Sequence, residues 1–253
     1  MEIIQNADDN SYNDPIPAIE ITYNGSLRID CNETGFKAKN VEAICQVGSS
    51  TKLAKDGDNP FIGEKGIGFK SVFKVADVVY IKSRYYSFKF DKGHDYLGII
   101  TPIWSTNLPF CPRDGYTTFY LQLSPNCNFT ALKHRLMELD HRMLIFLRQL
   151  RHIRIKIDSE PPIDLKRTAD VQDVAGRRIE ILQDNRPQRY IVSTHLQTNL
   201  PTTVKRREGI SNSEILLAFP LDTSGAPTVA SQHVYAFLPI RDYGLPVFLP
   251  IPH

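Results

Sequence analysis

Residues 62–71 read Ile-Gly-Glu-Lys-Gly-Ile-Gly-Phe-Lys-Ser, and the fold that the sequence predicts depends on this stretch. It holds three glycines at spacing i, i+3 and i+5: Gly63, Gly66 and Gly68. Such glycines let the backbone turn tightly and bring bare amide groups close to a ligand. Apolar residues with helical spacing follow, and free amides at the start of a helix favour an anion, most often a phosphate. Lys65 and Lys70 add positive charge, so we interpret the stretch as a cradle for a triphosphate.

A second group of polar residues stands at the beginning of the chain, Glu2-Ile-Ile-Gln-Asn6-Ala-Asp-Asp9. On a helix, Glu2, Asn6 and Asp9 share one side, and the apolar residues between them face another. A carboxylate one turn from a carboxamide suits a metal–nucleotide site, because the amide oxygen can bind Mg²⁺ and the carboxylate can take a proton from an attacking water. The alternative is a solvated polar helix face, so the prediction requires that these groups meet the glycine-rich stretch.

The composition is that of an ordinary globular protein of 253 residues, with 42% apolar and 23% charged residues. A net charge of +2 argues against a polyelectrolyte binder. The four cysteines are widely spaced and form neither a metal pattern nor a disulfide framework, which favours a reducing compartment. We find no signal-peptide pattern and no apolar run long enough to span a bilayer. We therefore expect an intracellular protein, cytoplasmic or nuclear, without a membrane partner.

Strand patterns dominate the rest of the chain. Residues 18–23 and 27–30 predict a hairpin around an Asn24-Gly25 turn. Further strands are predicted over 75–83, 85–90, 96–101, 116–123, 153–157, 178–182, 189–194, 215–219 and 233–238. Helices are predicted over 40–47 and, with an apolar stripe, over 128–150. The sequence Asp-Ser-Glu-Pro-Pro at 158–162 is typical of a boundary, which divides the chain into a domain at 1–157 and a strand-rich segment at 158–253.

With these pieces in order, residues 1–157 resemble the GHKL (Bergerat-fold) ATPase superfamily, which includes gyrase and the ninety-kilodalton heat-shock chaperones. Residues 2–9 look like its motif I, 30–36 like motif II and 63–69 like motif III, and Thr117 looks like the motif IV threonine. The closer resemblance is to the sacsin and NO VEIN group, which carries similar Gln-Asn-Ala-Asp-Asp and Gly-Glu-Lys-Gly-Ile-Gly-Phe-Lys-Ser strings. The fold implied is a two-layer α/β sandwich, a mixed and mainly antiparallel sheet with helices on one face, followed by a smaller strand-rich segment.

The resemblance also implies an activity, ATP binding with slow Mg²⁺-dependent hydrolysis that closes a lid in a chaperone-like protein. Glu2 would be the general base, and Asn6 would bind Mg²⁺. Lys52 and the backbone of 66–69 would hold phosphates, and Thr117 would join the adenine network. The nucleotide-binding residues implied are Asn6, Asp9, Asp30, Cys31, Asn32, Gly35, Lys52, Gly63, Lys65, Gly66, Ile67, Gly68, Phe69 and Thr117.

The sequence departs from the superfamily in two places. Cys31 occupies the position of the aspartate that reads adenine, and Asp30, one residue away, is expected on the opposite strand face. The chain also begins inside motif I, so we expect a fragment of a larger protein. These departures leave a second function open, a nucleotide-binding or protein-interaction module without hydrolysis. The partners expected are ATP and a client protein or neighbouring domains of a larger chain.

Nucleic acid is a weaker alternative. Its candidate residues form a basic run, Arg148, Arg151, Arg154 and Lys156. Strand alternation assigns part of this run to a solvated sheet face, so we do not expect nucleic acid to be the partner.

Overall fold

The computed structural model describes residues 2–45, 68–95, 97–173, 176–198, 213–228, 231–236 and 238–246. The chain forms two compact units. Unit 1 consists of Met1–Asp140 and Leu147–Leu165, and unit 2 consists of His141–Phe146 and Lys166–His253. The short segment 141–146 therefore leaves unit 1, belongs to unit 2, and returns.

Unit 1 is a sheet with short helices. Its strands are β1 (Ala18–Tyr23), β2 (Leu27–Cys31), β3 (Ala76–Ser83), β4 (Tyr86–Asp91), β5 (Ile103–Trp104), β6 (Thr117–Leu123) and β7 (His152–Ile157). Its helices are α1 (Glu2–Asp8), α2 (Ala38–Cys45), the 3-10 helix η1 (Phe69–Lys74) and α3 (Phe129–Met137). The predicted hairpin is confirmed as β1 and β2, joined by a turn in which Gly25 has a φ of 83°. Most of the other strands predicted before residue 158 are confirmed within one or two residues.

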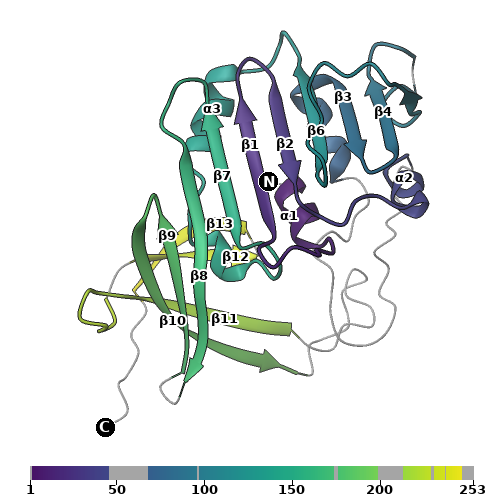
Figure 1. Ribbon diagram of the computed structural model, residues 1–253. Coiled ribbons are helices and arrows are strands. Elements are labelled where there is room, and N and C mark those ends of the chain that lie inside the picture. The colour runs from purple at the N-terminus through teal and green to yellow at the C-terminus, as the bar shows by residue number, and fades with distance from the viewer. Residues whose placement is uncertain are drawn as a thin grey trace. The chain divides into compact units, whose positions relative to one another are not determined.

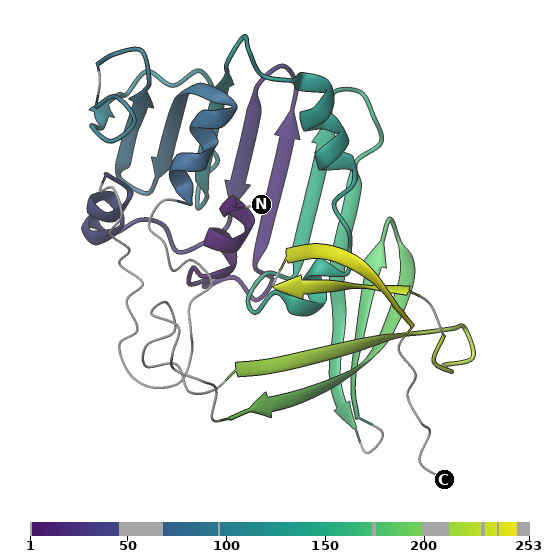
Figure 2. The same ribbon diagram turned by 180° about the vertical axis from the view of Figure 1, so that it is seen from behind.

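The sheet of unit 1 has one apolar face. On β1 and β7, which pair in parallel, every second side chain is buried: Ile19, Ile21, Tyr23, Ile153, Ile155 and Ile157. Helices α1, η1 and α3 lie on the same side of these strands, as the two opposite views show (Figures 1 and 2). The buried face of these strands is therefore the one over which the N-terminal helix α1 and η1 lie.

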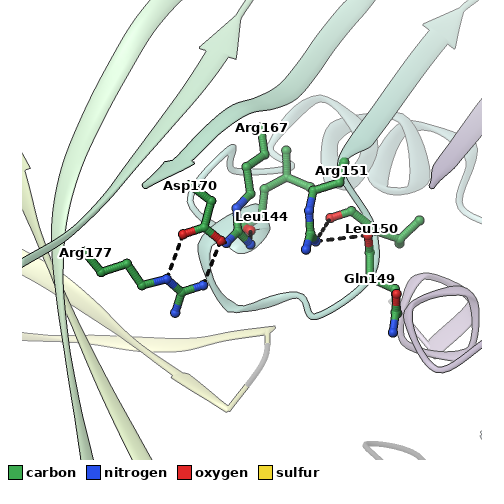
Figure 3. Close-up of polar contacts among 7 residues, drawn as sticks. All are labelled: Leu144, Gln149, Leu150, Arg151, Arg167, Asp170 and Arg177. Atoms are coloured by element: carbon green, nitrogen blue, oxygen red, sulfur yellow. Dashed lines mark hydrogen bonds and ion pairs between the residues drawn. The ribbon is translucent and has the colours of Figure 1, made fainter. Parts of the chain in front are cut away.

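Unit 2 consists mainly of strands. Its elements are α4 (Met143–Phe146), β8 (Ile163–Asp173, which begins in unit 1), β9 (Gly176–Gln183), β10 (Arg186–Gln197), β11 (Ser213–Leu221), β12 (Ser231–Ala236) and β13 (Leu238–Pro246). Within it, the carboxylate of Asp170 binds the guanidinium groups of both Arg167 and Arg177 (Figure 3). Arg167 also donates to the carbonyl of Leu144 (3.2 Å), which ties α4 to β8. The hydrogen bonds from Arg177, assisted by the charges of both arginines, lower the pKa of Asp170 to about 2.

The helix predicted over 128–150 is wrong in its length. The helical stretches are α3 and the four-residue α4, and residues 138–142 between them are not helical. Only the later part of the apolar stripe is buried, because Leu132 and Leu136 on α3 are half-buried. The buried part is shared between the units: Leu139, Leu147 and Leu150 belong to unit 1, and Met143 and Leu144 belong to unit 2. A single straight helix cannot place successive turns in two different cores, so the helix ends. The strand predicted over 96–101 is also wrong, because 97–100 form turns.

The predicted two-layer α/β sandwich is wrong as well. The strands form a mixed sheet of eleven, in the order β11-β10-β9-β8-β7-β1-β2-β6-β3-β4-β5, and β12 pairs with β13. None of the described helices exceeds nine residues, so they do not form a helical layer over this sheet. Two errors of sequence interpretation explain the difference. The strand β8, which continues the sheet past β7, was not predicted, and the helix over 128–150 was predicted too long.

Candidate functional site

The N-terminal helix meets the glycine-rich stretch at Gly68. Helix α1 buries Ile4 and Ala7, which leaves Glu2 in its exposed first turn. The Glu2 carboxylate lies so close to the α-carbon of Gly68 that a β-carbon at this position would overlap it. Gly68 itself directly precedes η1 and has helical φ and ψ of −57° and −49°. The structure therefore brings together the candidate general base and the last glycine of the predicted cradle.

An aromatic cluster fixes η1 on the sheet. The ring of Phe69 lies 6.0 Å from that of Phe90 on β4 and 5.8 Å from that of Phe119 on β6. Phe36, the last residue of motif II, packs edge-on against Phe119 at 6.2 Å. Phe69 is half-buried, and its ring contacts link motif III to the sheet beside motif II.

Lys70 does not supply free positive charge, which corrects the sequence interpretation. Its ammonium donates to the carbonyls of Ile44 (2.6 Å) and Ile99 (2.5 Å) and lies 4.3 Å from the centre of the Phe90 ring. Burial lowers the pKa of Lys70 to about 8. These contacts give Lys70 the role of holding the end of α2 near η1.

Motif II presents two neighbouring side chains to opposite faces of the sheet. Asp30 is 3% exposed, and its carboxylate binds the guanidinium of Arg28 (2.7 Å) and the hydroxyl of Thr118 (2.6 Å). Cys31 lies on the other face, and its thiol contacts the Tyr12 hydroxyl (3.1 Å). Asp30 and Cys31 therefore lie on opposite faces of the sheet, as strand alternation predicted. The Asp30 carboxylate cannot take the place of a carboxylate at position 31, because it is held on the other face.

The thiol of Cys31 belongs to a chain of hydrogen bonds that ends on α1. The Tyr12 hydroxyl donates to the carbonyl of Ala7 (2.6 Å), so the thiol donates to the Tyr12 oxygen. Burial raises the pKa of the Cys31 thiol to about 12, and the hydrogen bond with Tyr12 acts in the opposite direction but is the smaller effect. Burial also raises the pKa of Tyr12 above its ordinary value. Both groups are therefore neutral at physiological pH.

Asn32 and Thr117 make structural hydrogen bonds, and Gly35 has a special backbone conformation. The Asn32 side chain accepts from the amide of Ala18 (2.7 Å) and donates to the carbonyl of Ile16 (2.9 Å). Gly35 has a φ of 85°, a conformation that favours glycine. Thr117 is fully buried and shares a 2.6 Å hydrogen bond with Ser83, whose hydroxyl also accepts from the amide that follows Gly35 (2.8 Å).

A carboxylate that the sequence interpretation overlooked anchors α1 at its other end. Asp8 is 1% exposed and accepts hydrogen bonds from the amides of Arg148, Gln149 and Leu150, each at 2.8 Å. The signal was present in the sequence, because Asp8 stands four residues after the buried Ile4 and so falls on the apolar face. Tyr12 and Ser83 carried no comparable signal.

Several candidate residues lie outside the described part of the chain: Lys52, Gly63, Lys65, Gly66 and Ile67. Asn6 and Asp9 are half-buried at α1. Among the residues that the structure describes, no group of three histidine, cysteine, aspartate or glutamate side chains could hold a metal ion. Within the same residues, no helix has the length and apolar character needed to cross a membrane.

The basic run considered for nucleic acid is divided between different roles. The Arg151 guanidinium donates to the carbonyls of Gln149 (3.0 Å) and Leu150 (3.1 Å), close to its own backbone (Figure 3). Lys156 binds Glu20 on the neighbouring strand (2.8 Å). These two side chains are therefore engaged within unit 1.

Comparison with known proteins gives one informative similarity. No family model matches the sequence. The chain is 30% identical to Protein NO VEIN of Arabidopsis thaliana over an alignment of 281 residues, which covers 97% of this chain and 10% of that protein. The chain thus spans about a tenth of the length of the curated relative that it matches. The similarity extends over both units, and it relates the chain to a segment of a NO VEIN-like protein.

Proposed function

We propose that this chain binds ATP and hydrolyses it slowly in a Mg²⁺-dependent reaction. The observation that carries the proposal is the position of the Glu2 carboxylate beside Gly68. Two motifs that are more than sixty residues apart in sequence, one with a candidate base and one with a glycine-rich turn, meet at this point. A general base needs to stand within reach of a water that attacks a bound phosphate, and a glycine at the contact leaves room for both.

The residues present fit such a ligand. Mg²⁺ bound with a nucleotide is usually held by one or two protein oxygens together with phosphate oxygens. The amide oxygen of Asn6, one turn from Glu2, would be the protein ligand. When bound, Mg²⁺ supplies neutralisation of the phosphate charge. Glu2 would take the proton of the attacking water, and the backbone amides that lead into η1 would face the phosphates.

A second function, nucleotide binding without hydrolysis, is favoured by one observation. Cys31 is neutral and hydrogen-bonded to Tyr12, so it offers no carboxylate to an adenine amino group. If adenine is recognised only weakly at this position, the site would recognise mainly the triphosphate of the nucleotide. In either case the chain would act within a larger, chaperone-like protein, where nucleotide binding would change the conformation presented to a client protein or to neighbouring domains.

The test compares Glu2→Gln with the wild type in phosphate release and in Mg²⁺-ATP binding. Glu138→Gln is the matched control, because Glu138 is exposed and pairs with His134 on α3. Loss of a general base lowers turnover by about 100- to 10,000-fold, so we expect that fall in Glu2→Gln alone, with binding retained. Binding is measured by thermal shift, since a ligand at about 100 times its Kd stabilises the folded state by about 2.7 kcal/mol.

Each outcome of this test decides one point. Equal phosphate release in Glu2→Gln and the wild type removes Glu2 from the mechanism. Stabilisation by Mg²⁺-ATP without any release in the wild type selects the binding module. No stabilisation by ATP at any concentration overturns the proposed function.

A further inference from the structure

Asp8 is a buried carboxylate with an unusual set of partners. Its Oδ1 accepts from the amides of Gln149 and Leu150, and its Oδ2 accepts from the amide of Arg148, each at 2.8 Å. With 1% of its surface exposed, Asp8 has little access to water, and these three donors replace the hydration that an ionised carboxylate loses on burial. The three amides belong to the segment that follows α4, which ends at Phe146.

These hydrogen bonds fix the C-terminal end of α1. A helix of seven residues is not stable by itself in water, so its position depends on tertiary contacts. Ile4 and Ala7 bury its apolar side, and the Tyr12 hydroxyl binds the Ala7 carbonyl at the same end. Asp8 adds the connection to 148–150, the segment that leads into β7. Because a short helix moves as a rigid body, a shift at Asp8 is carried to Glu2 at its other end.

We propose that Asp8 is a positioning residue for the candidate site: its carboxylate locks α1 to the backbone of 148–150 and so holds Glu2 against Gly68. This inference rests on the proposed function for its effect on turnover. Asp8 acts at a distance from Gly68, since its carboxylate accepts its three hydrogen bonds from the backbone amides of 148–150. Its effect would pass through the position of Glu2.

The chemistry of the contact explains why the side chain is an aspartate. An asparagine keeps one acceptor oxygen, which could serve Gln149 and Leu150, but its amino group would then face the N–H of Arg148, donor against donor. A glutamate keeps both acceptors but is longer by one methylene group. It would displace either α1 or the amides by about 1 Å, and a misplacement of that size can lower turnover by about 100-fold.

The test uses Asp8→Asn with Asp170→Asn as the control. Asp170 is also an aspartate whose carboxylate accepts several hydrogen bonds, from Arg167 and Arg177, but it belongs to unit 2, whereas α1 and the amides of 148–150 belong to unit 1. Both variants are expected to unfold at a lower temperature than the wild type. All measurements are made on the full chain, at a temperature where each variant is completely folded.

Two readouts separate positioning from general destabilisation. The first is hydrogen exchange of the α1 amides, including those of Asp9 and Asn10, which donate to Gln5 and Ala7. We expect it to rise about 10-fold or more in Asp8→Asn and to stay at the wild-type level in Asp170→Asn. The second is phosphate release at saturating Mg²⁺-ATP, which we expect to fall about 100-fold in Asp8→Asn and less than 3-fold in Asp170→Asn. Asp8→Glu, which keeps the charge, serves if Asp8→Asn does not fold, with the same direction of change expected in both readouts.

The outcomes distinguish this inference from the proposed function. Wild-type exchange of α1 in the folded Asp8 variant overturns the positioning role, and so does an equal loss of turnover in Asp8→Asn and Asp170→Asn. If the wild type neither binds nor hydrolyses ATP, the proposed function fails, while the exchange measurement still decides whether Asp8 holds α1.

Discussion

Replacing Gly68 by alanine should raise the stability of the fold and abolish most of the turnover. Gly68 has φ and ψ of −57° and −49°, which alanine adopts without strain. Since alanine has fewer unfolded conformations than glycine, the substitution should stabilise the chain by about 0.4–1 kcal/mol. The new methyl group would overlap the Glu2 carboxylate, whose exposed end can move away at little cost in stability.

The same displacement of the Glu2 carboxylate should strongly lower the rate of ATP hydrolysis. Restoring ordinary van der Waals distance requires Glu2 to move by about 1 Å or more, and a general base misplaced by that distance loses about 100-fold in rate. The assay is phosphate release at saturating Mg²⁺-ATP, measured beside the midpoint of thermal unfolding. Stability and activity are thus expected to change in opposite directions, which a simple loss of folded protein cannot produce.

Gly25→Ala is the matched control for this prediction. Gly25 has a φ of 83° in the β1–β2 turn and no atoms within 4 Å of an added β-carbon. Alanine in that conformation costs about 1–2 kcal/mol, so this variant should lose stability and keep its turnover when folded. Wild-type phosphate release in Gly68→Ala, or a lower unfolding midpoint in that variant, would refute the reasoning about the Glu2 contact.

Two further predictions follow from the buried and paired groups. Cys31 is 2% exposed and its pKa is raised to about 12, so iodoacetamide at pH 8 should leave its thiol unmodified in the folded chain and should label the exposed Cys111. Mass spectrometry of the labelled protein measures this difference. Early labelling of Cys31 would contradict its packing against Tyr12. The pKa of Asp170 is lowered from 3.8 to about 2, so its contribution to stability is present above pH 4 and is lost as the pH falls through 2. Acid unfolding of Arg177→Gln should therefore begin at a higher pH than that of the wild type, and identical acid transitions would contradict this.

The sequence predicted local strand structure well because alternation has a direct physical cause. Buried Ile19, Ile21 and Tyr23 alternate with half-exposed residues, and the Asn24-Gly25 pair supplies the turn. The opposite faces of Asp30 and Cys31 were predicted for the same reason, since neighbouring residues on a strand point to opposite sides.

The sequence predicted the larger architecture poorly because periodicity does not say which core a residue joins. The stripe from Leu132 to Leu150 has helical spacing, but its members belong to two units, and the amides of 148–150 bind Asp8 in place of helical carbonyls. The β8 strand was missed because polar residues such as Asp164, Lys166 and Thr168 interrupt its apolar pattern. These two elements decide the fold class, so the predicted sandwich was wrong.

The structure describes part of the candidate site, and the rest of the site remains a prediction. The meeting of Glu2 with Gly68 followed from motif chemistry, whereas the role of Lys70 did not, because its two carbonyl partners come from distant segments. Lys52 and the first two glycines of the stretch stay predictions, as does the division of the chain after residue 157. The roles of ATP and Mg²⁺ rest on the experiments described above.

The path of the chain through 141–146 has a practical result for dissecting this protein. Because that segment belongs to unit 2 while its neighbours on both sides belong to unit 1, no single cut releases either unit intact. A clone that stops at residue 157 would carry α4 without β9 to β11, would remove Arg167 from the Leu144 carbonyl, and would present Met143 and Leu144 to water. Such a truncated product should aggregate, and a soluble first unit requires a short polar linker in place of residues 141–146.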